Sequence, residues 1–297
     1  MTVPLPSVEQ GHVVVPAPGP GAGNWAGAPH AILDAGAYWL SYRQRRAVGP
    51  ERDQARGVET VVARSEDGER FETVARIERE AFGTDSFERP CLVRRPDGGW
   101  RLYVCCATPG SKHWWIEAID ADDPDELPAG ERTVAFAGSE DLAVKDPIVE
   151  VGAGAWRAWI CCHPLTEPGE EDRMTTAYAT SSDGLSWDWH GEVLRPTPGT
   201  WDQRGARLTT ILSQEPMVVL YDGRASAAEN WFERTGIARA RDGALTADPD
   251  GPAAMSPHSD GGLRYASAVP LADGRTRFYF EAARPDGAHD LWTSVGS

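Results

Sequence analysis

The feature that most limits how this chain can fold is a hairpin pattern that recurs about every 60 residues. Five segments share it, and each has two short alternating or β-branched runs separated by a turn. They are APHAILDAGAYWLSYR from Ala28, RPCLVRRPDGGWRLYVC from Arg89, DPIVEVGAGAWRAWIC from Asp146, RLTTILSQEPMVVLYD from Arg207 and YASAVPLADGRTRFYFE from Tyr265. A fixed period of this size is typical of a repeat architecture, in which each repeat is one supersecondary unit.

A second pair of strands follows the hairpin within a repeat. In VETVVARSEDGERFETVARI and TTAYATSSDGLSWDWHGEVL, the pairs Asp67-Gly68 and Asp183-Gly184 are typical tight-turn residues. The chain shows no convincing long amphipathic helix. Four strands in each of five repeats predict an all-β protein, a five-bladed β-propeller with four antiparallel strands per blade.

We expect a single domain over residues 1–297 in which the N-terminal strand closes the ring. The last repeat has only three clear strands, and the run from His12 to Val15 precedes the first repeat without a partner there. Pairing of this run with the last repeat would complete the fifth blade and remove an exposed edge. The expected blades are about 28–80, 88–136, 145–195, 206–250, and 264–297 together with 12–15.

The charge balance limits the partners of the chain. Asp and Glu number 45 against 29 Lys and Arg, and the net charge of -16 argues against nucleic acid or an anionic membrane as a partner. The start, MTVPLPSVEQGHVVV, has no basic region followed by an apolar one, and no apolar run approaches membrane-spanning length. We therefore expect a cytoplasmic protein, and the sequence carries no signal for an oligomeric state.

The cysteines are expected to be small buried thiols. Their number is odd, two pairs are adjacent in sequence, and no CxxC spacing suggests a structural zinc. Nothing nearby indicates the stabilised thiolate that a reactive cysteine requires. They are Cys91, Cys105, Cys106, Cys161 and Cys162.

The repeat also predicts where charged side chains meet. In a propeller, the start of the first strand of each blade and the end of the second lie at the same mouth of the central channel. The first of these positions are Ala28, Arg89, Asp146, Arg207 and Tyr265, with Glu88, Lys145 and Arg264 just before three of them and His30 shortly after Ala28. The second are Arg43, Cys105, Cys161, Asp222 and Glu281. Buried charges at a channel mouth need charged partners or a charged or polyhydroxylated ligand, so we expect one pocket there.

Loops on the same face add aromatic and acidic residues. These are Lys112 to Trp115, His163, Trp201, Asp202 and Arg204, and the segment from Glu229 to Glu233. Tryptophan beside carboxylates suits a sugar, whose apolar face stacks on indole while acids and amides bind its hydroxyls.

Three short motifs carry a family resemblance. Asp146-Pro147 at the start of a blade, Glu88 to Pro90, and the segment from Tyr221 to Ala238 resemble the five-bladed propeller glycosidases. That superfamily includes glycoside hydrolase families 43, 32 and 68 and the glycoside phosphorylases of family 130. The resemblance implies an enzyme that cleaves a glycosidic bond by acid/base catalysis at the channel mouth, with a small-molecule or oligosaccharide substrate. Some members hold a cation in the channel, and His30 with Asp146 could supply ligands, but the sequence has no ligand motif of fixed spacing, so we expect no metal or other cofactor.

The resemblance also assigns roles and shows two departures. Members of these families use a base or nucleophile from the first blade and an acid from a later one, and the matching positions here hold Ala28 and Arg207. Asp146 matches the third-blade acid that orients substrate. The remaining catalytic candidates are Glu88 and either Glu229 or Glu233. Expected substrate-binding residues are His30, Arg43, Arg89, Lys145, Arg207, Asp222, Arg264, Tyr265 and Glu281.

Alternatives stay open for both the reaction and the residues. Phosphorolysis would replace the base-activated water by phosphate and would give the basic residues an anion to hold. A propeller that has lost the chemistry and binds or transforms a small anionic or polyhydroxylated ligand would also explain Ala28 and Arg207. Asp146 could instead cap a turn, Glu88 could form an exposed ion pair, and His30 could be a core histidine. Glu229 and Glu233 could belong to a solvated face.

Overall fold

The computed structural model describes residues 2–47, 56–152, 154–241 and 244–297, and over these residues the regular secondary structure is almost entirely β-strand. Three sheets have four antiparallel strands each, built from consecutive strands. We call each set of consecutive strands a group and number the five groups in chain order; the three four-stranded sheets are the second, third and fourth groups. The second group is β6 (Cys91–Arg94), β7 (Trp100–Ala107), β8 (Trp114–Ala121) and β9 (Glu131–Phe136). The third is β10 (Leu142–Gly152), β11 (Ala155–Pro164), β12 (Thr175–Ser181) and β13 (Asp188–Leu194). The fourth is β14 (Gly205–Gln214), β15 (Met217–Arg224), β16 (Arg234–Arg241) and β17 (Ala244–Ala247).

The remaining sheet has eight strands and contains both the first and the fifth groups. The first group is β2 (Trp25–Asp34), β3 (Ala37–Arg46), β4 (Arg56–Ser65) and β5 (Glu72–Glu78), and the fifth is β18 (Leu263–Pro270), β19 (Thr276–Ala283) and β20 (His289–Gly296). The parallel pairing of β2 with β20 links them, with Trp25 opposite His289.

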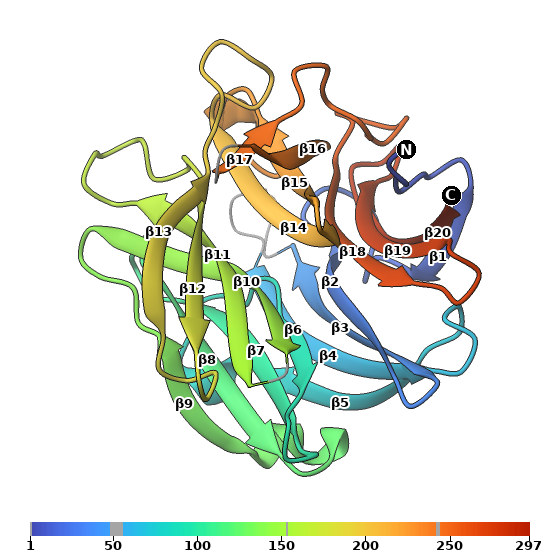
Figure 1. Ribbon diagram of the computed structural model, residues 1–297, viewed down its shortest axis with the longest axis vertical. Helices are drawn as coiled ribbons and strands as arrows, with labels where there is room; N and C mark the ends of the chain where they lie inside the picture. Colours follow the sequence, from blue (N-terminus) through green and yellow to red (C-terminus); the bar gives the residue numbers. More distant parts are fainter. Residues whose placement is uncertain (1, 48–55, 153, 242–243) are drawn as a thin grey trace.

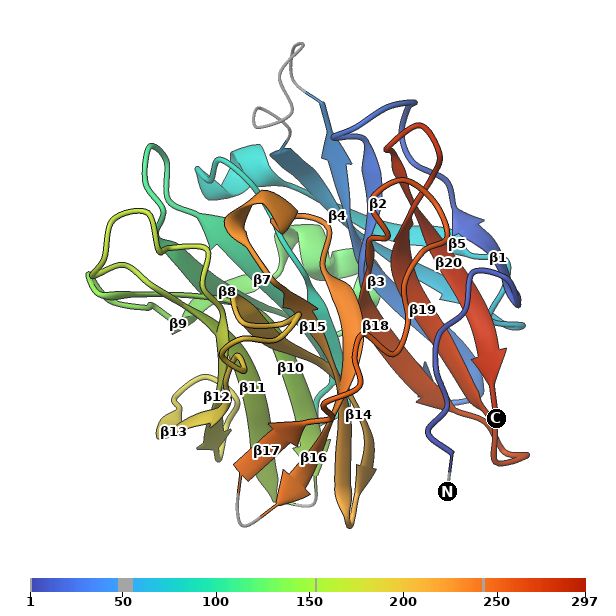
Figure 2. The same ribbon diagram turned by 90° about the horizontal axis from the view of Figure 1, so that it is seen from above.

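The N-terminal strand pairs where the sequence predicted. β1 (Gly11–Val15) runs antiparallel to β20, with Gly11 opposite Ser294 and Val13 opposite Trp292. The fifth group therefore has four strands, and its outer strand comes from the other end of the chain. As a result the first described residues and the C-terminus lie on the same side of the molecule (Figure 2).

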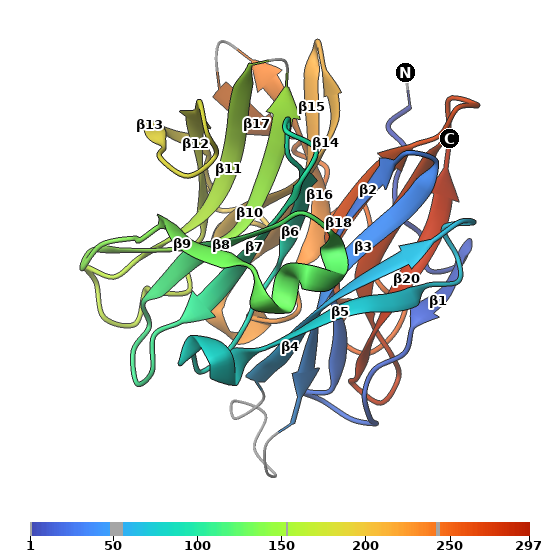
Figure 3. The ribbon, with the colours of Figure 1, turned by 90° about the horizontal axis from the view of Figure 1, so that it is seen from below.

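The five groups surround a common centre (Figure 1). Their first strands contact each other in cyclic order, from β2 to β6, β10, β14 and β18, and β18 contacts β2 again. Five hydrophobic clusters hold the ring, each between two neighbouring groups. A short 3-10 helix, η3 (Pro124–Ala129), packs against β5 and β8 at the outside (Figure 3).

Three of the first strands, β2, β10 and β18, contain a bulge at the position that the repeat predicted as the strand start. β2 begins at Trp25 and β10 at Leu142, so Ala28 and Asp146 lie inside their strands, and the predicted starts were wrong. Ala28, Asp146 and Tyr265 have φ values of 51°, 51° and 56°, in the left-handed region that costs a non-glycine residue about 1–2 kcal/mol. The pairing register shifts at each of them. A bulge re-aims side chains, and it tolerates the missing N–H of Pro29 and Pro147.

The five cysteines are free and buried, as expected. Four of them lie in the hydrophobic clusters. Burial raises the pKa of Cys91 to about 12, so that thiol stays protonated and acts as a small apolar group.

The two predicted Asp-Gly turns are built alike. Asp67 accepts hydrogen bonds from the amides of Glu69 and Arg70. Asp183 accepts hydrogen bonds from the amides of Leu185 and Ser186 in the same way. Gly68 and Gly184 have φ values of 75° and 73°. These turns join the third and outer strands, so their role is structural. No helix in the described parts of the chain has the length and apolar character needed to cross a membrane.

Candidate functional site

A pocket of about 440 Å³ lies at the centre of the ring and is lined by six of the thirteen predicted catalytic and substrate-binding residues. Among the residues predicted from the repeat, it is lined by Glu88, Glu233, Lys145, Arg207, Arg264 and Tyr265. Loop residues predicted for the same face, including Lys112, Trp114, His163 and Trp231, line it as well. We call this the charged pocket.

Glu88 is held by basic residues of the first group. Its side chain is 7% exposed; Arg45 Nη1 donates to Oε1 at 3.2 Å, and Arg43 Nε lies 3.3 Å from Oε2. Burial would raise the pKa of Glu88, but Arg43, Lys145, Arg45 and Arg264 outweigh burial and lower it to about 2. Glu88 is therefore an anion across the physiological range.

Glu233 is the second buried carboxylate of the pocket wall. Arg224 and Arg264 each donate to one of its oxygens at 2.6 Å, and Arg207 Nη2 lies 3.8 Å away. Burial again opposes ionisation, but Arg264, Arg207 and Arg224 lower the pKa of Glu233 well below its usual value. Both predicted acids in the wall are thus fixed as anions.

These pairs form a closed ring of charged side chains at the floor of the pocket. Arg43 bridges Glu88 and Glu281, and Arg264 bridges Glu281 and Glu233. Arg207 links Glu233 to Tyr265: its Nη2 lies 3.8 Å from Glu233 Oε1, and its Nη1 donates a hydrogen bond to the Tyr265 hydroxyl at 2.9 Å. The Tyr265 hydroxyl closes the ring, 3.3 Å from Glu88 Oε2.

Asp146 lies beneath the pocket rather than in its wall. The residue is fully buried; Oδ2 accepts from Arg207 at 3.0 Å, and Oδ1 accepts from the amide of Arg89 at 3.1 Å. Its own amide contacts Cys105 Sγ at 3.0 Å. The carboxylate therefore ties the second group to the fourth and positions Arg207.

Asp222 and Glu281 are also buried below the wall, and both connect neighbouring groups. Asp222 Oδ2 accepts from the amide of Tyr265 at 2.9 Å, and Glu281 Oε2 accepts from the amide of Ala28 at 3.2 Å. These two acceptors satisfy amides that the bulges remove from the strand ladder. A Cβ on Gly27 would collide with the Glu281 carboxylate, so glycine is needed there.

Asp222 differs from the other carboxylates in its titration. Burial raises its pKa to about 6, although Arg207 donates to Oδ2 at 2.7 Å and opposes the shift. Its Oδ1 has no hydrogen-bond partner in the described chain. Asp222 pairs with one arginine, whereas Glu88 and Glu233 each pair with at least two, so its pKa lies above theirs and closer to neutral pH.

The two remaining central residues lie away from the pocket. Arg89 is fully buried, and its guanidinium donates to the carbonyl oxygens of Pro29 at 3.0 Å and Ala266 at 3.4 Å. His30 lines a separate hollow of about 540 Å³ at the hairpin end of the first strands. The expectation that His30 joins the charged pocket is therefore corrected: it follows the bulge, and the strand has carried it toward the other end of the ring.

Glu229 does not line the charged pocket either. It lies in η4 (Ala227–Glu229), where its carboxylate accepts from the amide of Ala225 at 2.7 Å and from Arg234 at 3.3 Å. These contacts hold the loop that carries Asn230 and Trp231 into the wall.

His163 presents a neutral imidazole to the pocket. Its Nδ1 lies 2.8 Å from the carbonyl oxygen of Glu171, which only accepts, so Nδ1 carries the proton. Nε2 is then an acceptor, 3.5 Å from the thiol of Cys161. Burial and then Lys145 lower the pKa of His163 well below its usual value.

Two arginines of the site were missed by the sequence reasoning. Arg45 lies between the rings of Trp25 and Trp231, at 4.7 Å and 4.6 Å from their centroids, and bonds Glu88. Arg224 bonds Glu233 and the backbone carbonyl of Asp172. A signal was present, because both residues stand two positions after predicted site residues and therefore face the same side of their strands.

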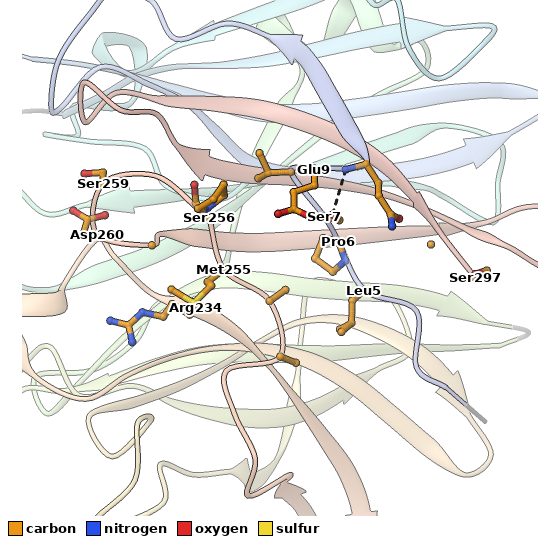
Figure 4. Close-up of a pocket in the computed structure, with 17 residues that line it drawn as sticks. Leu5, Pro6, Ser7, Glu9, Arg234, Met255, Ser256, Ser259, Asp260 and Ser297 are labelled. Atoms are coloured by element: carbon orange, nitrogen blue, oxygen red, sulfur yellow. Dashed lines mark hydrogen bonds between the residues drawn. The ribbon is translucent and has the colours of Figure 1, made fainter.

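A more voluminous hollow, of about 920 Å³, has less of this chemistry. It lies between the N-terminal segment and the loop that carries Met255 to Asp260 (Figure 4). Its charged residues are Glu9, Arg234 and Asp260. Ser7 Oγ accepts from the amide of Gln10 at 3.3 Å within it. Among the described residues, no group of three or more His, Cys, Asp and Glu side chains is arranged to hold a metal ion.

Comparison with known proteins finds likeness in structure and none in sequence. No family model matches the chain, and no curated protein matches its sequence. A thermostable family-43 glycoside hydrolase superposes with a TM-score of 0.66 at 14% identity, covering 91% of this chain and 88% of the other. The β-1,2-mannobiose phosphorylase of Listeria innocua, solved with β-1,2-mannobiose, gives 0.64 at 15%, covering 99% and 92%. A glycoside hydrolase of the GH130 family of mannoside phosphorylases, which targets β-1,2-mannosidic linkages in Candida mannan, superposes with a TM-score of 0.63 at 13% identity. The match covers 98% of this chain and 93% of the other. At these identities the likeness shows a shared fold, that of the propeller glycosidases and phosphorylases.

Proposed function

We propose that this chain is one five-bladed propeller domain that binds a carbohydrate in the charged pocket and processes its glycosidic bond. The five strand groups are the blades, and β1 completes the fifth. The observation that carries the proposal is the convergence of Glu88 and Glu233, which come from different groups, on one wall that also contains Trp114 and Trp231. The proteins of similar fold include glycoside hydrolases and a β-1,2-mannobiose phosphorylase.

The geometry suits stabilisation of positive charge better than proton abstraction. A carboxylate with a pKa near 2, such as Glu88, is a weak base, but it remains an anion at any working pH. Such an anion stabilises the oxocarbenium-like transition state of glycoside cleavage. We therefore assign Glu88 and Glu233 to charge stabilisation and Asp146 to holding Arg207 and Tyr265 in place.

The test is a substrate panel assayed with and without inorganic phosphate. Aryl glycosides and oligosaccharides are incubated with the wild-type protein and with Glu88→Gln and Glu233→Gln. Each variant should lower kcat/KM by about a hundredfold or more, because it removes an anion next to the developing charge. Glu66→Gln is the matched control, since that side chain is 84% exposed and lies in a distant turn. Turnover that depends on phosphate would identify phosphorolysis.

A second candidate, binding without catalysis, is favoured by one specific observation. Glu88 and Glu233 are paired to arginines that keep them ionised, and Asp222, whose pKa is about 6, lies beneath the wall. Glycoside cleavage needs a proton for the leaving oxygen, and neither wall carboxylate holds one at neutral pH. Saturable sugar binding with no turnover under any condition of the panel would favour this candidate over the enzyme.

A further inference from the structure

The chain has two lysines in 297 residues, and both line the charged pocket. The other basic residues are arginines, although lysine is an ordinary surface residue. Lys145 belongs to β10, and Lys112 lies in the loop between β7 and β8. A compact ammonium has properties that a planar guanidinium lacks, so this placement indicates a function for the ammonium group.

Lys145 differs from the buried arginines in having spare hydrogen-bonding capacity. Its side chain is 14% exposed, and its Nζ lies 4.0 Å from Asp146 Oδ2, beyond hydrogen-bond distance. Arg207, by contrast, donates to Asp146, Asp222 and Tyr265. Within the described chain no residue accepts a hydrogen bond from Lys145, so its donors are available to a ligand.

The carboxylates of the wall take their hydrogen bonds from arginines rather than from the lysines. Glu88 and Glu233 each bond two arginines, and Asp172 bonds Arg204 through both of its oxygens. The remaining acids, Asp85 and Glu171, accept from backbone amides nearer the rim. The two lysines therefore add positive charge to the pocket without being hydrogen-bonded to these carboxylates, in a chain whose net charge is -16.

The aromatic residues of the wall support the same conclusion. Lys145 Nζ lies over the ring of Trp114 at 5.1 Å, and the Arg45 guanidinium lies over Trp231 at 4.6 Å. One face of each indole is thus covered by a cation, which leaves less stacking surface for a neutral sugar ring. A sugar that carries an anionic group meets the ammonium at the edge of the remaining indole surface.

We propose that the ligand of this pocket is a sugar bearing an anionic oxygen group, a carboxylate or a phosphate ester, which Lys145 binds directly and Lys112 binds from the rim. The proposal rests on the proposed function in taking the ligand to be a carbohydrate. It adds the chemical class of that carbohydrate and the residues that select it. The charge-assisted hydrogen bond from Lys145 should make the anionic sugar bind about tenfold more tightly than its neutral counterpart.

The scarcity of lysine allows a direct test by NMR. Reductive methylation with ¹³C-formaldehyde preserves the charge and labels only Lys112, Lys145 and the α-amino group of the chain. Matched sugars are titrated into the labelled protein: glucose against glucuronate and glucose 6-phosphate, and galactose against galacturonate. The signals are assigned with Lys112→Arg and Lys145→Arg. An anionic sugar should shift both lysine signals and leave the α-amino signal in place.

Binding constants of unlabelled variants complete the test. Lys145→Met should abolish the tenfold preference for the anionic sugar, Lys112→Met should reduce it, and Arg195→Met should leave it unchanged. Arg195→Met is the matched control, because this substitution also removes one positive charge, from a side chain that is 72% exposed and directly follows β13. Lys112 is exposed, so its variant tests the proposal even if Lys145→Met is unstable.

Each outcome decides the proposal. Equal affinity for neutral and anionic sugars, or no lysine shift with any anionic sugar, overturns it. If inorganic phosphate shifts both signals where the anionic sugars do not, the anion is a separate co-substrate and the proposal is also overturned. The titration measures binding without turnover, so an inactive protein that prefers anionic sugars would contradict the enzymatic function and support this inference.

Discussion

The two ends of the ring are built by the same five first strands but have opposite chemistry. At one end lies the charged pocket, with carboxylates and basic side chains in a closed ring. At the other lies the hollow that contains His30, which we call the hairpin-side pocket. There the strands contribute mainly aliphatic and hydroxyl side chains, among them Ile32, Val93, Val149 and Thr209.

The difference separates what the fold requires from what it carries. Close packing of the strands is satisfied at the hairpin side by β-branched side chains, whose hydroxyls bond backbone groups, as Thr209 Oγ1 does with the carbonyl of Leu220. At the other end, burying several ion pairs has a desolvation cost that apolar residues would avoid. The charges are therefore not needed for packing, which supports a role in ligand binding.

The largest expected effect comes from breaking the charged ring. Arg207→Met keeps the stem of the side chain but leaves Asp146 and Asp222 without their shared cation. Removing one partner of a buried ion pair typically costs about 3–5 kcal/mol. Denaturant unfolding of wild type and variant at neutral pH measures this loss. A loss below about 1 kcal/mol would show that the ring is solvated and that the contrast between the two ends is weaker than the contacts indicate.

The second effect concerns two carboxylates of the charged end with opposite titrations. Between about pH 4 and 6, native Asp222 binds a proton that the unfolded chain has released, so its contribution to stability falls as pH rises through that window. Glu88 has a lowered pKa, so its contribution is present above the unfolded pKa and is lost as pH falls toward about 2. A shift of roughly two units corresponds to about 3 kcal/mol at most.

The variant Asp222→Asn isolates the first of these titrations. It should flatten the pH dependence of the unfolding free energy between pH 4 and 6, whatever its effect on absolute stability. Unfolding curves at several pH values across that window measure the slope for wild type and variant. An unchanged slope would assign the titration to another group.

The repeat in the sequence predicted the strands and the side chains at the pocket mouth. Alternation and turn residues are local, and the period places equivalent residues in one ring, so Glu88, Lys145 and Tyr265 were predicted at the pocket. The pairing of the N-terminal run with the last repeat was also predicted correctly, because the last repeat lacks a strand.

The depth of each residue in the ring could not be predicted from the period. The bulges at Ala28, Asp146 and Tyr265 shift the register, so Asp146 is buried below the wall and His30 reaches the other end. Which arginine pairs with which carboxylate depends on contacts between groups that are far apart in sequence. The partners of Glu233, Arg224 and Arg264, illustrate this, since Arg264 comes from the following repeat.

A smaller effect is expected from the matching change at the hairpin side. Thr209→Val preserves shape and removes the hydroxyl that donates to the Leu220 carbonyl at 3.2 Å. Thr209 is fully buried, so the expected loss is about 1 kcal/mol, the usual value for one neutral hydrogen bond. Denaturant unfolding under the conditions used for Arg207→Met gives the comparison. A loss as large as that of Arg207→Met would contradict the view that only the charged end depends on strong polar contacts.

The smallest effect should come from the ion pair at the rim of the hairpin-side pocket. Arg157 lies 3.0 Å from Glu150, and the two side chains are 38% and 31% exposed. Water screens such a pair and the long side chains lose entropy in forming it, so Arg157→Met should change the unfolding free energy by less than about 0.5 kcal/mol. Because the substitution is arginine to methionine in both variants, the two losses of unfolding free energy compare a solvated ion pair with the buried ion pairs of Arg207. If Arg157→Met were as destabilising as Arg207→Met, burial would not be the property that distinguishes the two ends. A near-zero change beside a loss of several kcal/mol would instead place the electrostatic cost of this fold at the end where the ligand is proposed to bind.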